Sequence, residues 1–477
     1  MAVFFGSGDT RSTALNFLTM WKAAAEWEPG TTVTNEIHYE TAHSGSRIDE
    51  YTLTGSFEYS VDPATLELTS LTGAVTQFDY HWEETLNGFE EASSRISDFS
   101  LDISKFDGSL TAVQLSMLIF AGDDKIEGVA RPDVGFDAPY TNVLYGYGGN
   151  DTIIGGTGRD ILNGGSGRDI MTGNQGDDVY YVDNARDIVR EFAGEGDDLV
   201  FSSISYTLPG NVDDLRLTGA GAINGTGNAG SNTLFGNDAA NILNGMDGDD
   251  AMYGGLGDDT YFVQSDGDSV YESSNAGTDL VIASINYTLD SHVENLVLRG
   301  HGNLFGVGNA LANNIRGNDD ANLLNAGDGN DTLYGNGGND TLIGGKDNDT
   351  LHGDQGNDTL TGGRGAEKLY GGVGADTFIL QSFRDSVLAS RDTIYDFSQS
   401  QQDKIDLSII DARTTATGNQ AFTFVGTKAF SDKGGELRYF NKAGETFIYG
   451  DLDGDAGIDF SIRLKGVFDL KSSDFIL

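Results

Sequence analysis

Acidic residues recur every nine positions in the middle of this chain, each at the end of a glycine-rich stretch. Twelve of them keep this spacing within three runs: Asp151, Asp160, Asp169, Asp178, Asp250, Asp259, Asp331, Asp340, Asp349, Asp358, Glu367 and Asp376. Carboxylate and carbonyl oxygens are the ligands that calcium prefers, in sets of about six to eight. The spacing therefore predicts that these acids are metal ligands for several calcium ions.

Each nine-residue unit reads as a glycine-rich turn followed by a short strand. The unit Gly155–Asn163 is followed by a second of the same pattern, and an apolar residue such as Leu333 usually stands two places after the acid. Two units make one coil, so stacked turns lie 18 residues apart in sequence and about 4.8 Å apart in space. One turn has too few oxygens for an ion, and we expect stacked pairs to share them. The expected pairs are Asp151/Asp169, Asp160/Asp178, Asp331/Asp349, Asp340/Asp358 and Asp349/Glu367.

The alternative interpretation is that acids in glycine-rich turns only keep an exposed loop solvated. That alternative suits a single copy of the pattern, whereas repetition of glycine, acid and apolar residue in phase favours calcium binding. In residues 228–245 the acid is replaced by Asn232 and Asn241. We expect these coils to be structural and poorly loaded with calcium.

A longer repeat of 81 residues encloses the short one. Tyr180–Val182 recurs as Tyr261–Val263, and Asp187–Glu191 recurs as Asp268–Glu272. This match predicts that the irregular segments are wider coils of one solenoid that runs from about residue 124 to 378. Separate repeat blocks on flexible linkers are the alternative.

The repeats resemble those of the RTX (repeats-in-toxin) calcium-binding proteins, and the last hundred residues resemble the C-terminal part of serralysin-type metalloproteases. The second resemblance rests on Arg391–Phe397, Asp403–Ser408, Gln420–Gly426, Gly450–Asp455 and the final Asp474–Leu477. It implies a type I secretion signal and a protein that stays unfolded in a calcium-poor cytoplasm. Serralysins also have a His-Glu-x-x-His zinc helix, and no two histidines of this chain have that spacing. The resemblance thus covers calcium binding and secretion but not the protease.

Three acids near the C-terminus alternate along the chain. Asp451, Asp453 and Asp455 could hold one further calcium ion, or they could form an acidic, solvated turn.

The composition fits a calcium-loaded protein without disulfides. The chain of 477 residues has no cysteine, 67 glycines, 5 prolines and a net charge of −46, which excludes nucleic acid as a natural partner. The longest apolar run, near Leu115–Ala121, is too short for a transmembrane segment. Met1–Ser7 has no basic region, so we expect secretion without a cleaved N-terminal signal peptide.

The first 120 residues have a different character from the repeats. They predict a small α+β or β-sandwich-like domain, with helices over residues 11–27 and from Ser109 to about Phe120. Strands are expected at Tyr51–Leu53 and Phe57–Val61, with a turn at Thr72-Gly73. We find no catalytic motif there: the segment around His43 lacks the nucleophile elbow, and His81 beside Glu83 fits a surface strand better than acid–base chemistry.

The sequence therefore predicts a mainly β protein in three parts. They are an N-terminal domain (1–120), an elongated parallel β-roll (121–380) and a C-terminal β cap with the secretion segment (381–477). We expect a secreted, non-enzymatic calcium-binding protein of a surface layer, biofilm matrix or adhesion system that self-associates or binds a cell-surface partner. The alternatives are a secreted hydrolase with its active site in residues 1–118 and, less favoured, a toxin.

Overall fold

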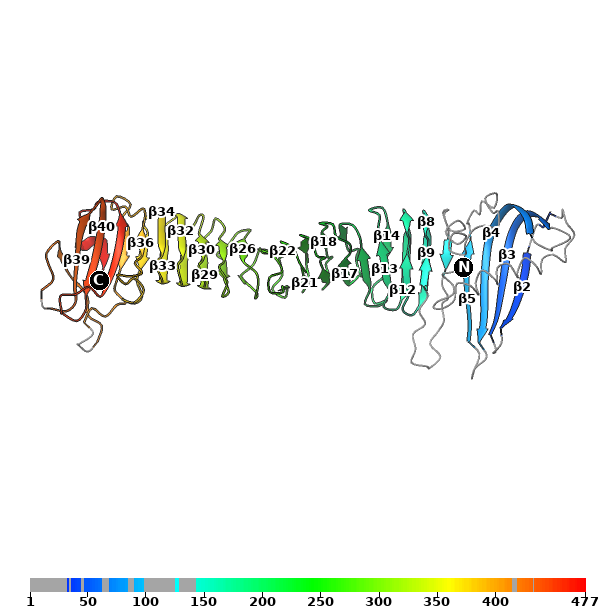
Figure 1. The fold of residues 1–477 in the computed structure, drawn as a ribbon, viewed down its shortest axis with the longest axis horizontal. Coiled ribbons are helices and arrows are strands. Elements are labelled where there is room, and N and C mark those ends of the chain that lie inside the picture. The colour runs from blue at the N-terminus through cyan, green and yellow to red at the C-terminus, as the bar shows by residue number, and fades with distance from the viewer. Residues whose placement is uncertain are drawn as a thin grey trace. The chain divides into compact units, whose positions relative to one another are not determined.

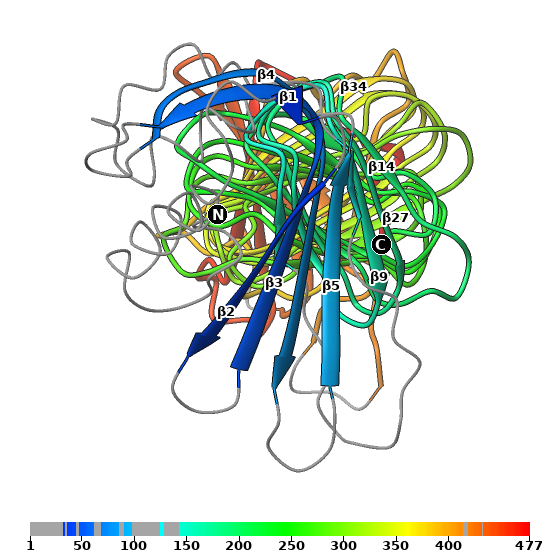
Figure 2. The same cartoon turned by 90° about the vertical axis from the view of Figure 1, so that its right-hand side faces the viewer.

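The computed structural model describes two units, residues 1–235 and 236–477 (Figures 1 and 2). Described throughout are residues 143–413, 418–431 and 433–477. Before residue 143 it describes the backbone of strands at residues 32–33, 36–43, 47–61, 68–84, 90–97 and 125–127, with side chains only at Lys125 and Ile126. Both predicted helices, at 11–27 and from Ser109, lie outside the described residues. Within the described part, no helix is long and apolar enough to cross a membrane.

The first unit begins with a sheet of long antiparallel strands. Its members are β1 (Thr32–Val33), β2 (Glu36–His43), β3 (Arg47–Val61), β4 (Leu68–Glu84), β5 (Glu90–Ser97) and β6 (Lys125–Glu127). The two strands predicted at Tyr51–Leu53 and Phe57–Val61 are parts of the single strand β3. The predicted turn at Thr72-Gly73 is wrong, because both residues lie inside β4, paired with Glu58 and Phe57 of β3.

This sheet continues into the coils of the roll. Strand β6 pairs with β5 in antiparallel fashion and with β9 (Thr152–Thr157) in parallel fashion. The parallel ladder then passes to β12 (Ile170–Gln175) and β14 (Ile188–Arg190). The antiparallel strands therefore extend one sheet of the roll.

The opposite sheet of the first unit shows that the irregular segment is part of the solenoid. Its parallel strands are β7 (Val143–Tyr145), β10 (Ile161–Asn163), β13 (Val179–Val182), β15 (Leu199–Ser202), β17 (Asp214–Leu217) and β19 (Thr233–Phe235). Ile161 pairs with Val179, one 18-residue coil later, and Val179 pairs with Leu199, 20 residues later. The wider coils predicted from the 81-residue repeat are thus present in this unit.

The second unit repeats this arrangement with two parallel sheets. One contains β20 (Ile242–Asn244), β22 (Thr260–Val263), β24 (Leu280–Ala283), β26 (Asn295–Leu298), β28 (Asn314–Arg316), β30 (Thr332–Tyr334), β32 (Thr350–Gln355), β34 (Lys368–Val373) and β36 (Thr393–Ile394). The other contains β25 (Tyr287–Thr288), β27 (Phe305–Val307), β29 (Leu323–Asp328), β31 (Thr341–Lys346), β33 (Thr359–Arg364), β35 (Thr377–Ile379), β37 (Lys404–Asp406) and β42 (Phe475–Ile476). Strands β21 (Ala251–Tyr253) and β23 (Ser269–Tyr271) also pair.

The core of each coil is a thin layer of apolar side chains. In the regular coils the residue two places after the acid is fully buried, as at Leu333, Leu342, Leu351 and Leu360. The residues on either side of it in the strand are partly exposed. Each coil therefore buries little apolar area, as the short strands predict.

The C-terminal strands close the roll, as expected for a cap. Strands β38 (Thr423–Gly426), β39 (Glu436–Lys442), β40 (Glu445–Asp451) and β41 (Phe460–Lys465) form a continuous sheet, drawn in orange and red in Figure 1. Strand β41 then pairs with β36 of one roll sheet, and β42 pairs with β37 of the other. Both sheets of the roll thus receive a final strand from this segment.

Candidate metal sites in the glycine-rich turns

All twelve predicted acids lie buried at the ends of the turns. Each is the residue directly before a strand of the roll, and none is more than 1% exposed. Their burial is unusual for carboxylates, which are seldom removed from water unless they are paired or bind a metal. The acids are therefore not a solvated face of the roll.

The structure stacks the acids in columns, one coil apart. The backbone N–H of Asp331 donates to Oδ1 of Asp349 at 2.9 Å, and that of Asp340 donates to Oδ1 of Asp358 at 2.8 Å. The first block repeats the contact for Asp151 with Asp169 and for Asp160 with Asp178. Four of the five expected pairs are brought together in this way.

The fifth pair contains a glutamate, Glu367, in place of an aspartate. Its strand is in register with that of Asp349, since Thr350 pairs with Lys368. The backbone N–H of Glu367 in turn donates to Oδ1 of Asp392, at 3.3 Å, and so connects the column to the C-terminal segment.

The second carboxylate oxygen faces a space lined by backbone oxygens. In Asp340, Asp349 and Asp358 this Oδ2 atom is buried and has no hydrogen-bond partner. The space beside Gly335 is lined by Oδ2 of Asp340 and the carbonyl oxygen of Gly353. A Cβ at Gly335 would collide with both oxygens. A carboxylate oxygen and carbonyl oxygens that converge without a donor are the arrangement that a calcium ion requires. The residues present therefore fit calcium.

Glycine is needed where successive turns touch. Gly356 has a φ of 140°, and a Cβ at this position would collide with the carbonyl oxygen of Gly338 one coil earlier. The predicted left-handed glycines are thus present in the turns.

Burial without a cation raises the pKa values of these acids. It raises the pKa of Asp349 to about 8, opposed by a backbone hydrogen bond and assisted by the charges of Asp331 and Glu367. Burial likewise raises the pKa of Asp340 to about 7. The ion-free turns therefore favour protons on their carboxyl groups, and a divalent cation would supply the missing positive charge.

In turns with asparagine, the side-chain amide makes hydrogen bonds to nearby oxygens, so these turns do not need an ion. The Asn322 side-chain amide donates to Oδ1 of Asn318 at 2.9 Å, and that of Asn232 donates to the carbonyl oxygens of Val212 and Asp213. An N–H group thus occupies the role that a cation would have beside an aspartate. This supports the expectation that residues 228–245 are structural, although their calcium loading remains a prediction.

Sequence reasoning missed acids that continue the columns into the wider coils. Oδ1 of Asp198 accepts the backbone N–H of Asp178 at 2.8 Å, and Asp279 does the same for Asp259. Glu191 joins the first pair and Glu272 the second, with one oxygen of each acid in a cluster within 4.8 Å of the others. The 81-residue repeat contains the signal, since Asp198 and Asp279 also keep that offset.

The C-terminal acids need one correction. Asp451 and Asp453 do lie together, but their partner in the cluster is Asp459, not Asp455. Both oxygens of Asp451 accept backbone N–H groups, from Gly454 and Ala456. The backbone of this turn therefore already provides donors to both oxygens of the buried Asp451.

Comparison with known proteins identifies two families. A family described as RTX calcium-binding nonapeptide repeat (4 copies) matches residues 141–189. Another, described as peptidase M10 serralysin C terminal, matches residues 219–477. Both resemblances noted in the sequence are thereby confirmed, and no protease-domain family was found. The search of curated proteins gave no match.

Two solved structures that match this chain are a subunit of an epimerase and a lipase. The AlgE6R3 subunit from the Azotobacter vinelandii mannuronan C5-epimerase is 26% identical, with 35% of this chain and 80% of that chain covered and a TM-score of 0.23. The extracellular lipase LipA from Serratia marcescens is 12% identical, with 95% and 84% covered and a TM-score of 0.15. Neither similarity indicates what this chain does.

Proposed function

The chain belongs to the peptidase M10 serralysin C-terminal family, and from that premise we propose that calcium folds its roll outside the cell to make a structural or interaction protein. Its RTX nonapeptide repeats bind calcium, and the two families together suggest type I secretion. In this proposal the twelve predicted acids are the calcium ligands. The protein then serves in a surface layer, a biofilm matrix or adhesion.

The observation that carries the proposal is the column of buried, stacked carboxylates. Oδ2 atoms without a hydrogen-bond partner recur at Asp331, Asp340, Asp349 and Asp358. Ordering a residue costs about 1–2 kcal/mol of backbone entropy, and a coil with so few buried apolar residues recovers little of it. Burial of the acids adds a further cost, so cation binding and folding should be coupled.

An interaction role is supported by the outer surface and by the strand edges. Pairs of aromatic rings stack on the outside of the coils, with Tyr181 and Phe201 5.1 Å apart and Tyr253 and Tyr271 4.6 Å apart. Among the described strands, β2 pairs only with β3. A strand with an open edge can pair with a second chain. The hydrolase prediction for residues 1–118 lies outside both matched ranges and stays a prediction.

Light scattering during a calcium titration of the full chain tests this role. We expect particle size to grow after calcium-induced folding, with no growth when magnesium replaces calcium at the same ionic strength. Folding without growth, at protein concentrations that span a wide range, would rule out calcium-controlled self-assembly. Calcium-dependent folding would survive that result, so the two parts of the proposal are separable.

A further inference from the structure

A glutamate replaces the first glycine of the turn in one coil of each 81-residue repeat. Strands β12 and β14 pair with Thr172 opposite Arg190, so that the following residues, Gly173 and Glu191, occupy equivalent positions one coil apart. Strands β21 and β23 pair with Tyr253 opposite Tyr271, which places Glu272 one coil after Gly254 in the same way. In a regular coil this position offers only a backbone carbonyl oxygen. Here it adds a side-chain carboxylate.

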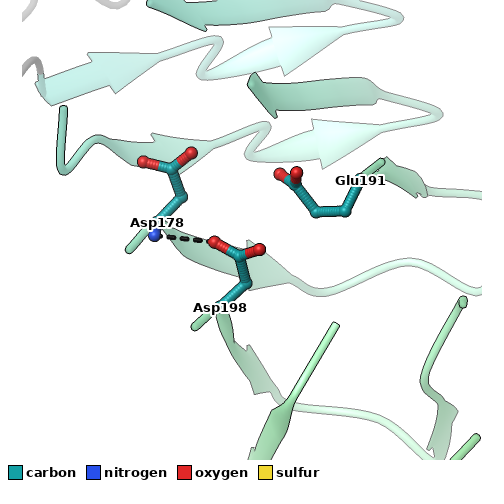
Figure 3. Close-up of side chains that lie close together, drawn as sticks. All are labelled: Asp178, Glu191 and Asp198. Carbon is teal, nitrogen blue, oxygen red and sulfur yellow. Dashed lines mark hydrogen bonds between the residues drawn. The ribbon is translucent and has the colours of Figure 1, made fainter. Parts of the chain in front are cut away.

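The glutamate side chain enters the space beside the stacked aspartates. Figure 3 shows Glu191 directed toward Asp178, which precedes β13, and Asp198, which precedes β15. Oε1 of Glu191 accepts the N–H of Gly173, at 3.3 Å, and the hydroxyl of Tyr180. One oxygen of each acid lies within 4.8 Å of the other two.

The second cluster has the same construction. Asp259, Glu272 and Asp279 each contribute an oxygen within 4.8 Å of the others, and the hydroxyl of Tyr261 donates to Oε1 of Glu272. A side chain at Gly254 would collide with three oxygens of this cluster. They are the hydroxyl of Tyr261, Oδ2 of Asp259 and Oε1 of Glu272. The arrangement therefore occurs independently in both units.

Buried oxygens in both clusters have no donor. Asp178 is 1% exposed and Glu191 is 7% exposed, yet Oδ2 of the first and Oε2 of the second have no hydrogen-bond partner. In the second cluster the same is true of Oδ2 in Asp259 and in Asp279. Three carboxylates this close repel one another, and their burial strengthens the repulsion. Burial, with the charges of Asp198 and Asp178, raises the pKa of Glu191 to about 8.

We propose that the two Asp–Glu–Asp clusters are a second class of divalent-cation site, which binds calcium more tightly than the nonapeptide turns do. Calcium affinity rises with the number of charged ligands and with the rigidity of the site. Each cluster adds a carboxylate where the regular turn has a glycine, and a tyrosine hydroxyl fixes that carboxylate. The two sites load first and start folding at one point in each unit.

Counting the bound calcium of the full chain by competition with a chelating indicator tests the proposal. We expect two ions per chain in a class that binds at least about tenfold more tightly than the remainder. The double variant Glu191→Gln with Glu272→Gln should lose this class. The matched control, Asp197→Asn with Asp258→Asn, removes the same charge from exposed neighbours of the clusters and should keep it. A single class of sites in the unaltered chain, or two tight sites retained in the glutamine variant, would overturn the proposal.

Terbium luminescence tests the location of the ion even if the glutamine variant fails to fold. Terbium substitutes for calcium and emits strongly when a nearby tyrosine absorbs the light. Tyr180 and Tyr261 are fully buried beside the clusters, and phenylalanine preserves their ring packing. In Tyr180→Phe with Tyr261→Phe, tyrosine-excited emission from the first ions bound should fall severalfold. Unchanged emission would place those ions elsewhere and contradict the proposal.

This inference rests on the proposed function only in its choice of calcium as the cation. If calcium folds the chain at a single class of sites, the clusters have no special role and the proposed function stands. If calcium does not fold the chain at all, the proposed function fails whatever the clusters bind.

Discussion

At the scale of single residues, the choice between aspartate and asparagine decides whether a turn needs an ion. Asp349 presents a buried Oδ2 without a donor, whereas the amide of Asn322 makes its own hydrogen bond in the equivalent position. The same backbone can thus form a turn that awaits a cation and a turn that is complete without one. The asparagine coils are therefore expected to support their calcium-loaded neighbours.

Replacing one buried acid should raise the calcium concentration that folding requires. In Asp349→Asn a ligand oxygen is exchanged for an N–H group that a cation repels, so we expect at least one ion fewer per chain and a folding midpoint at higher calcium. The control Asp347→Asn changes the same charge on an exposed side chain of the same turn and should shift the midpoint much less. Equal shifts for the two variants, measured by circular dichroism, would mean that general charge and not ligation sets the midpoint.

At the scale of strands and turns, the nine-residue period predicts the construction of the regular coils. It predicts the strand positions, the buried apolar residue two places after each acid and the 18-residue register of the regular coils, because in a solenoid each residue repeats its environment one coil later. The prediction of a turn at Thr72-Gly73 was wrong because it relied on a local signal outside the repeats. A local glycine signal was overridden by pairing with the long strand β3.

The period also explains which site residues escaped prediction. Glu191 and Glu272 stand at a glycine position of the repeat, so a search for acids at the end of each turn passes over them. Their place beside Asp178 and Asp259 depends on coils of 20 residues, whose shape the short period does not define. The longer repeat aligns the two glutamates with each other but does not show what they face.

The acid columns predict an inverted pH dependence when calcium is absent. Burial raises the pKa of Asp178 and of Asp349 to about 8 in the folded state. Aspartate in an unfolded chain has a pKa of about 3.9, so between these values the folded state binds more protons. The free energy of unfolding should therefore rise as the pH falls through about 8 and level off below about 4.

Circular dichroism of the chain in excess chelator, recorded across this pH range, measures the effect. We expect β-structure to increase toward acid, while at limiting calcium acid should lower calcium uptake because protons compete for the same oxygens. Loss of β-structure toward acid in the chelator would show that the columns are not the groups that oppose folding.

At the scale of the whole molecule, the net charge and the thin apolar core both indicate that the chain needs bound cations to fold. The chain has a net charge of −46, and such self-repulsion opposes a compact state until cations neutralise it. Each unit has its own coils, its own columns of acids and its own terminal sheet. Calcium-poor conditions should thus favour a chain extended enough for secretion, and calcium-rich conditions the folded roll.

The most direct test follows β-structure and bound calcium together in one titration of the full chain. Far-UV circular dichroism and a calcium indicator should report a single cooperative transition, from coil to β, at roughly 10⁻⁴–10⁻³ M calcium, the range of extracellular calcium modules. Magnesium should not replace calcium. Full β-structure in excess chelator, or calcium uptake without any change in structure, would contradict the claim that ion binding and folding are one event.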